Sequence, residues 1–358
     1  MRLDQRFRDR VKRAEAEDLS RRGRAKLDER VLEVGVALFR SLDPQDVREI
    51  LTLYGLTYVG HSPIAVGTVN TNVKVETGEG TRFLRVNEGK SVEDVAREAA
   101  IVEHVAARGV PTPAPFRTLA GPPFGAWKGQ LVSLFPWRSG RTLPRSEVQP
   151  VHARAAGEAL ARLHLAGESF PDRRPGRYEP DEIDRRLSGI RGLAGSDPAL
   201  AAAVAVLGPE LGALASARTP GLPEALIHGD LFLDNVLFEQ DRLAALLDFE
   251  QASWGRLAYD LAVTLLAFAF GREDFRPDMV EALLAGYVAL RPVTPAERDG
   301  FGSELRFVAC RFAVTRITDV YLKRAAGAAP GKVFRRYLLR LERVKQHLGA
   351  ADGLLALP

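Results

Sequence analysis

The chain has 358 residues, 46% of them hydrophobic and 27% charged, with 50 Lys and Arg against 46 Asp and Glu. This length suffices for a large core and two lobes, and the composition is that of a globular protein. The near balance of charge argues against a nucleic-acid-binding protein, and the single Cys310 excludes an internal disulfide. The longest apolar run, Leu261 to Phe270, is too short to cross a membrane, and no apolar signal segment opens the chain, so we expect a cytoplasmic protein.

The first residues of the chain are predominantly basic and carry no sustained apolar stripe. We interpret residues 1–41 as a charged N-terminal extension, in which apolar residues recur at helical spacing from Leu27 to Leu42. Asp43 can cap a helix and Pro44 is tolerated at a first helical position. These two residues predict a helix that continues to Tyr54.

The next segment has the pattern of a small sheet with one main helix. Alternating apolar and polar residues predict strands at Ile64 to Val66, Val73 to Glu76 and Arg82 to Val86. A helix is predicted from Val92 to Arg108, because the prolines that follow it force an extended backbone. A buried strand is then predicted from Gln130 to Phe135.

Beyond residue 137 the composition changes from strand-like to Ala- and Leu-rich, which is typical of helices. We therefore predict a strand-rich lobe at 42–137 and a helical lobe at 138–358. Within the helical lobe, His164 is interpreted as a packed helix residue, and Gly208-Pro209 is expected to interrupt a helix. The helices are expected at Val151 to Leu165, Asp181 to Leu193, Pro198 to Ala215, from Leu261, from Thr294-Pro295 and from Lys332 to Leu348.

The most informative stretch is ALIHGDLFLDNVLFEQDRLAALLDFE, which begins at Ala225. Val236 to Phe238 and Leu243 to Leu247 read as two strands of a hairpin, which would bring Asp248 back beside Asn235. Phosphoryl transfer needs a group that accepts the proton of the attacking hydroxyl and oxygen ligands that hold magnesium on the nucleotide phosphates. Asp230 suits the first role, and Asn235 with Asp248 suits the second. The alternative is that all three are turn or cap residues, since Asp and Asn favour loops.

The residues HGDLFLDNVLF, LLDFE and YDLA resemble the aminoglycoside phosphotransferase-like superfamily of small-molecule kinases. Within it they are most similar to the bacterial homoserine kinases of that fold, which act in threonine biosynthesis. The resemblance extends from about Leu42 to about Arg316. It implies an α+β, two-lobed protein-kinase-like fold with a small antiparallel β lobe and a mostly helical large lobe. It also implies ATP and Mg2+ as cofactors and the hydroxyl of a small molecule as acceptor.

The resemblance assigns the nucleotide phosphates to two parts of the small lobe. The turn that contains Gly67 and Asn70 would lie over the phosphates. Arg85 occupies the position where kinases of this general plan place a phosphate-contacting Lys, and Arg differs from Lys in its planar fork. Glu98 either orients Arg85, as the superfamily implies, or is a solvated helix charge.

By the same resemblance, the segment after the buried strand is the hinge whose backbone holds the adenine. Pro136 has no N–H group, so the donor would come from Phe135 or Trp137. Asp260 is expected to brace the catalytic loop or to cap a helix.

Two arginines of a C-terminal helix are candidates for the acceptor site. Leu305-Arg306-Phe307 and Arg311-Phe312 resemble a further stretch of homoserine kinases. Arg306 or Arg311 would clamp a substrate carboxylate in a bidentate manner, or both are surface charges on a basic helix.

Three alternatives remain open at this stage. The acceptor is L-homoserine by resemblance, or another hydroxyl compound such as an amino alcohol, a sugar derivative or an aminoglycoside. The chain can also be an inactive nucleotide-binding relative, or an adaptor that binds nucleic acid through its basic extension. The short interval from Asp248 to Asp260 favours a small molecule over a protein substrate. The sequence does not indicate the oligomeric state.

Overall fold

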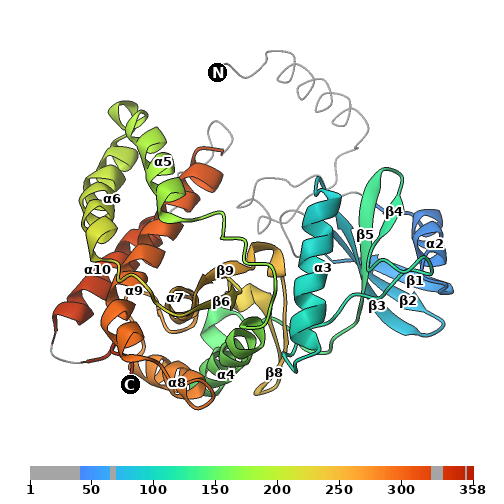
Figure 1. The fold of residues 1–358 in the computed structure, drawn as a ribbon. Helices are drawn as coiled ribbons and strands as arrows, with labels where there is room; N and C mark the ends of the chain where they lie inside the picture. The colour runs from blue at the N-terminus through green and yellow to red at the C-terminus, as the bar shows by residue number, and fades with distance from the viewer. Residues whose placement is uncertain (1–40, 65–69, 324–333, 351–352) are drawn as a thin grey trace. The chain divides into compact units, whose positions relative to one another are not determined.

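The computed structural model describes residues 41–64, 70–323, 334–350 and 353–358. Nearly all of the expected N-terminal extension and Gly67 lie outside these residues. The described chain has a mixed α+β, protein-kinase-like fold, in which a sheet and its helix α2 precede a mostly helical part (Figure 1). The predicted fold class is thereby confirmed.

An antiparallel five-stranded sheet in the order β1-β2-β3-β5-β4 forms the first part of the fold. Its inward-facing residues and the apolar face of α2 (Pro44–Thr52) form one hydrophobic core. Asp43 caps α2 with a capping box, as the sequence predicts. The strands are β1 (Tyr58–Pro63), β2 (Thr71–Thr77), β3 (Gly80–Asn87), β4 (Gly125–Trp127) and β5 (Gln130–Pro136).

The first strand differs from the sequence-based expectation. The pattern predicts a strand at Ile64 to Val66, of which only Ile64 lies among the described residues. The first strand that the structure shows is β1, whose residues pair with β2 from Tyr58 onward. This edge strand is largely exposed, so its residues are mostly polar and lack the alternation of apolar and polar residues that predicts a strand.

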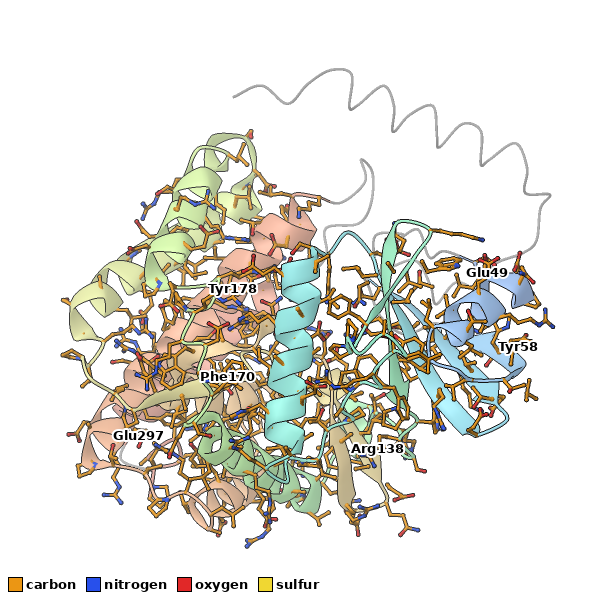
Figure 2. The ribbon with its side chains drawn as sticks, turned by 45° about the vertical axis from the view of Figure 1, so that its right-hand side comes forward. Glu49, Tyr58, Arg138, Phe170, Tyr178 and Glu297 are labelled. Carbon is orange, nitrogen blue, oxygen red and sulfur yellow. The ribbon has the colours of Figure 1, made fainter. Side chains whose placement is uncertain are left out.

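Helix α3 (Val92–Ala106) connects the sheet to the helical part of the chain. Ser91 caps its N-terminus in a capping box with Asp94. Ile101, Val102 and Val105 belong to the large core of the helical part rather than to the core of the sheet. Phe170, which is labelled in Figure 2, packs edge-on against the ring of His104, with ring centroids 5.1 Å apart.

The helical part is built around one large core that includes residues from most of its helices. Helices α4 and α8 approach closely because each presents a glycine to the other: a Cβ on Gly157 would lie 2.2 Å from the carbonyl oxygen of Leu283, and one on Gly286 would lie 2.2 Å from that of Arg154. The helices are α4 (Pro150–Gly167), α5 (Pro180–Arg191), α6 (Pro198–Ala217), α7 (Leu257–Phe268), α8 (Pro277–Val288), α9 (Pro295–Arg316) and α10 (Arg335–Gly349).

Helix α6 continues through Pro209, so the expected interruption is wrong. Leu207, Glu210 and Leu214 form its buried side, and Pro209 lies on the exposed side. The carbonyl that the proline leaves unpaired can therefore be solvated, and packing on α5 and α9 holds the helix together. By length and composition α6 is also the one described helix apolar enough to cross a membrane, although core helices pass the same test.

Two short two-stranded sheets position the stretch that the sequence singles out. β7 (Val236–Glu239) pairs with β8 (Arg242–Leu246), which confirms the predicted hairpin. β6 (Glu224–Ile227) pairs with β9 (Ser253–Arg256), a strand that the sequence pattern does not reveal. The segments 228–235 and 247–252 therefore emerge from adjacent strand ends.

Candidate active site

The loop that carries Asp230 is held by one buried carboxylate. Asp260, at the start of α7, accepts hydrogen bonds from the backbone N–H groups of His228 (2.7 Å) and Gly229 (2.8 Å). Gly229 has a φ of +76°, and a Cβ there would lie 3.0 Å from the carbonyl oxygen of Gln251, so glycine suits this turn. Asp260 thus braces the loop, as the sequence analysis expects.

Asp260 is in turn held by a buried chain of polar groups. His164 Nε2 lies 3.1 Å from Asp260, and His164 Nδ1 lies 2.7 Å from the hydroxyl of Tyr287. Arg291 donates to the same hydroxyl and to Glu297 at the start of α9. His164 is therefore more than a packed helix residue. The sequence interpretation missed its partners because they lie about a hundred residues away.

Asp230 itself is half-buried next to a guanidinium. Burial raises the pKa of Asp230, while the charge of Arg311 opposes that rise. A carboxylate with a raised pKa is a better proton acceptor than an ordinary aspartate. The carbonyl oxygen of Asp230 accepts a hydrogen bond from Asn235 Nδ2 at 2.9 Å, which engages the amide nitrogen of Asn235.

Asn235 and Asp248 lie at the open end of the β7–β8 hairpin. Val236 pairs with Leu246, and the N–H group of Leu247 donates to the carbonyl oxygen of Asn235 at 2.9 Å. Asp248 has a φ of 61° and a ψ of 70°, a left-handed conformation that non-glycine residues seldom adopt. Its side chain is exposed. The hairpin thus brings two residues with oxygen-bearing side chains to the same end of the ladder, and such oxygens are hard ligands of the kind that Mg2+ prefers.

A buried ion-pair network faces these residues from the sheet. Arg85 of β3 pairs with Glu98 of α3 at 2.8 Å, so of the two interpretations of Glu98 the structure shows the pair. Lys90 pairs with Glu98 at 3.0 Å and with Glu250 at 2.9 Å. Burial alone would lower the pKa of Arg85. The negative charge of Glu98, followed in size of effect by that of Asp248, outweighs burial, so the pKa of Arg85 is raised. The network therefore links β3 and α3 to the segment that begins at Asp248.

Lys90 was missed by the sequence analysis. It lies in the turn between β3 and the capping residue Ser91, where a single lysine gives no periodic signal. Its role in joining Glu98 to Glu250 depends on how α3 packs against that segment.

The other residues expected near a nucleotide lie on the same sheet. Asn70 is buried just before β2, and its Oδ1 has no hydrogen-bond partner among the described residues. Phe135 of β5 lies opposite Phe83, with the Arg85 guanidinium 5.5 Å from its ring centroid. Trp137 is 39% exposed, and Lys74 Nζ lies 5.4 Å from its ring centroid.

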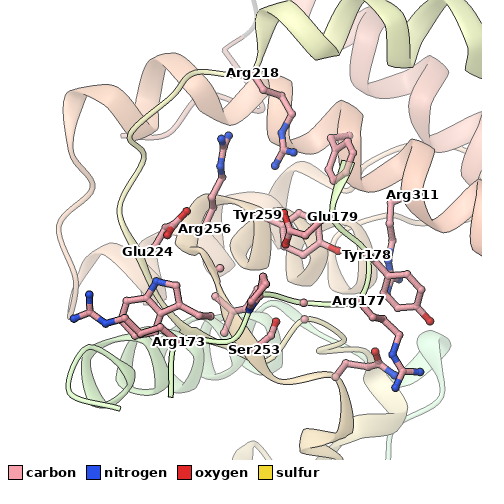
Figure 3. A pocket seen from close by; sticks show the side chains of 18 residues that line it. Arg173, Arg177, Tyr178, Glu179, Arg218, Glu224, Ser253, Arg256, Tyr259 and Arg311 are labelled. Carbon is pink, nitrogen blue, oxygen red and sulfur yellow. The ribbon is translucent and has the colours of Figure 1, made fainter. Parts of the chain in front are cut away.

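A pocket of about 250 Å³ opens beside the loop that carries Asp230 (Figure 3). Gly229 forms part of its wall, and Arg311 and Tyr259 line it together with residues of the segment before α5. Arg311 is only 3% exposed, and its guanidinium lies 4.0 Å from the ring centroid of Tyr178 and 3.8 Å from that of Phe312. Within the described chain this guanidinium has no hydrogen-bond or ion-pair partner, and its Nε is buried.

Arg306 does not line this pocket. Its guanidinium donates to Glu210 of α6, which also pairs with Lys345 of α10. Of the two arginines singled out in the sequence, the structure therefore brings Arg311 to the pocket and leaves Arg306 in a packing contact between helices.

Comparisons with known proteins agree with this arrangement. Residues 60–300 match the model of the phosphotransferase enzyme family. The chain is 33% identical to a homoserine kinase of Rhodopseudomonas palustris (strain BisB18) over 292 residues, covering 79% of this chain and 87% of that protein. It is 35% identical to a homoserine kinase of Caulobacter sp. (strain K31) over 289 residues, covering 79% and 89%.

Among solved structures, the amicoumacin kinase hAmiN in complex with AMP-PNP, Ca2+ and Ami has the same fold. The two superpose with a TM-score of 0.64 at 16% identity, covering 85% of this chain and 94% of that one. The chain therefore belongs to the phosphotransferase enzyme family, as a kinase that transfers phosphate to the hydroxyl of a small molecule.

Proposed function

We propose that this protein is an ATP- and Mg2+-dependent kinase that phosphorylates the hydroxyl of L-homoserine in the cytoplasm. The observation that carries the choice of acceptor is Arg311, a buried guanidinium in a pocket beside Asp230 that has no hydrogen-bond or ion-pair partner among the described residues. A cation that is desolvated and unpaired is costly unless a ligand pairs with it. A carboxylate on the acceptor would be that ligand, and homoserine carries both a carboxylate and a hydroxyl.

The residues at the end of the β7–β8 hairpin fit a magnesium ion. The amide oxygen of Asn235 is left free by the hydrogen bond of its Nδ2, and the Asp248 carboxylate is exposed without a partner in the described chain. Two protein oxygens leave most of an octahedral shell for phosphate and water, as is usual for Mg2+ in kinases. Bound there, the ion would neutralise charge on the nucleotide phosphates.

Asp230 would act on the acceptor hydroxyl. The hydroxyl oxygen forms a bond to the γ-phosphorus while the bond from that phosphorus to the β–γ bridging oxygen breaks, and the electron pair leaves with ADP. The hydroxyl proton passes to Asp230, whose pKa is raised by burial. Asp260 holds the loop through two backbone hydrogen bonds, so Asp230 needs little reorganisation during the reaction.

The nucleotide would lie between lobes at 42–137 and 138–358. Arg85, held by Glu98, would contact its α- and β-phosphates. Asn70 belongs to the turn expected over the phosphates. A backbone N–H of Phe135 or Trp137 would hold the adenine, since Pro136 has none.

An ADP-release assay over a panel of hydroxyl compounds tests this function. The panel contains L-homoserine, an amino alcohol, a sugar derivative and an aminoglycoside, each with ATP and Mg2+. We expect the highest kcat/KM with L-homoserine. A higher value with a compound that lacks a carboxylate would refute the choice of homoserine, and the assignment to the family would stand.

A further inference from the structure

The pocket beside Asp230 contains a second unpaired polar group. Tyr259, the residue before Asp260, lines the pocket, and its hydroxyl forms no hydrogen bond with any described residue. The pKa of Tyr259 is raised by burial to about 12, and Arg311 is the charge that acts on it most strongly. Tyr259 is therefore a neutral hydroxyl close to a cation.

Arg311 and Tyr259 line the same pocket, and Gly229, the residue before Asp230, forms part of its wall. The charge of Arg311 lowers the pKa of both Asp230 and Tyr259 against the effect of burial. Figure 3 shows Arg311 and Tyr259 directed into one pocket, with Tyr178 alongside Arg311. The contacts with Tyr178 and Phe312 confine the guanidinium, so its position is set before any ligand arrives.

Two other arginines that line the pocket have an ion-pair partner within the protein. Arg218 and Arg256 both pair with the fully buried Glu304, at 2.7 and 2.8 Å. Their charges are thus partly neutralised within the protein. Arg311 has no such carboxylate partner within the part of the chain that the structure describes, which distinguishes it from these two arginines.

We infer that Tyr259 and Arg311 together form a carboxylate-binding subsite, with Tyr259 as a specificity-determining residue that selects an acceptor carrying a carboxylate. The Tyr259 hydroxyl donates one hydrogen bond to the carboxylate, and the guanidinium provides the charge and further donors. Tyr178 positions the guanidinium by stacking. This inference rests on the proposed kinase function and adds to it the group that distinguishes a hydroxy amino acid from an amino alcohol.

The test compares L-homoserine with 3-aminopropan-1-ol, which is the same molecule without its carboxylate. Steady-state kinetics are measured for the wild type and for Tyr259→Phe, which removes the hydroxyl and keeps the ring. A hydrogen bond to a charged group corresponds to about a 10- to 100-fold change in affinity. We expect KM for L-homoserine to rise by about that factor, with KM for 3-aminopropan-1-ol, KM for ATP and kcat nearly unchanged.

Tyr321→Phe is the matched control, because it removes a hydroxyl that donates to Asp197 and does not line the pocket. It should leave both acceptors unaffected. Arg311→Lys keeps the charge but loses the fork, and it should also reduce the preference for L-homoserine over the amino alcohol. Melting curves check that each variant is folded.

The outcomes separate this inference from the proposed function. Equal loss of kcat for both acceptors in Tyr259→Phe would mean that Tyr259 acts through the neighbouring Asp260, and would overturn the subsite while homoserine remains the substrate. If the wild type does not phosphorylate homoserine, the proposed function fails, and calorimetry with 4-hydroxybutanoate decides the subsite. If 4-hydroxybutanoate binds to the wild type and binds more weakly to Tyr259→Phe, the subsite is supported. If it does not bind to the wild type, the subsite is overturned.

Discussion

At the scale of single residues, the site depends on side chains whose backbone is held by others. Asp230 follows Gly229, whose backbone N–H donates a hydrogen bond to Asp260. Asp248 adopts a left-handed conformation after the end of β8. Such a conformation costs of order 1–3 kcal/mol and persists where the surroundings determine it. Its presence at a proposed metal ligand is consistent with a functional constraint.

Replacing Asp230 by Asn tests its proposed role as proton acceptor. The amide has nearly the same shape but cannot take the proton, so we expect kcat to fall by about 10²- to 10⁴-fold. The affinity for nucleotide, measured by calorimetry, should change little. Asp234→Asn is the matched control, since Asp234 is exposed in the same loop and should tolerate the change. Full activity in Asp230→Asn would contradict the assignment.

Replacing Asp248 by Asn tests the proposed metal site. Asparagine tolerates the left-handed backbone of position 248, so the variant removes a charge without adding strain. We expect the Mg2+ concentration for half-maximal activity to rise by about tenfold or more, because a neutral oxygen is a weaker ligand for a hard cation. A titration of activity with Mg2+ measures this, and an unchanged midpoint would exclude Asp248 as a ligand.

At the scale of elements, the contact between α4 and α8 positions the groups that hold the loop that carries Asp230. The two helices approach through Gly157 and Gly286. Tyr287 follows Gly286 and contacts His164 of α4, which in turn contacts Asp260. The spacing of these helices therefore determines whether the chain of polar groups reaches the loop.

Replacing Gly286 by Ala should disturb this contact. The new Cβ would lie 2.2 Å from the carbonyl oxygen of Arg154, so the helices must move apart, at a cost of about 1–3 kcal/mol in the free energy of unfolding. Gly212→Ala in α6 is the control, because nothing lies within 4 Å of its Cβ and alanine favours a helix by up to about 1 kcal/mol. Urea unfolding measures both. Equal stability of the two variants would refute the close contact.

At the scale of the whole molecule, buried ionisable groups couple stability to pH. Burial lowers the pKa of His164 below its ordinary value of 6.5, although Asp260 opposes this. Burial alone would raise the pKa of Asp260, but His164 and the backbone of His228 hold it below its ordinary value of 3.8. These directions agree with a neutral His164 that donates through Nε2 to an ionised Asp260.

The stability of the protein should therefore fall as the solution becomes acidic. Below about pH 6.5 an unfolded chain takes up a proton at position 164 that the folded chain does not, so the free energy of unfolding decreases by up to about 1.4 kcal/mol per pH unit. Asp260 adds a further loss only when the pH falls below its ordinary value of 3.8. Melting temperatures measured from pH 7.5 to 5 should fall less steeply in His164→Gln than in the wild type. An equal slope would show that His164 does not titrate as described.

The local sequence was sufficient to predict much of the structure of the stretch that carries Asp230, Asn235 and Asp248. The spacing of Asp230, Asn235 and Asp248, with two strand patterns between the last two, predicted the hairpin that brings Asn235 and Asp248 together. Capping residues such as Asp43 and Thr294 marked helix starts correctly. These features depend on backbone geometry within a few residues, which periodicity and cap chemistry reveal.

Tertiary structure alone decided which distant residues meet. The residues adjacent in sequence to Lys90, His164 and Tyr259 do not indicate which side chains these three contact. Arg306 pairs with a carboxylate of another helix and Arg311 does not, although the two look alike in the sequence. The strand β9 and the continuity of α6 likewise depend on packing. The physical reason is that pairing, burial and charge at these positions arise from contacts between segments far apart in sequence, whose positions follow from the packing of the whole core.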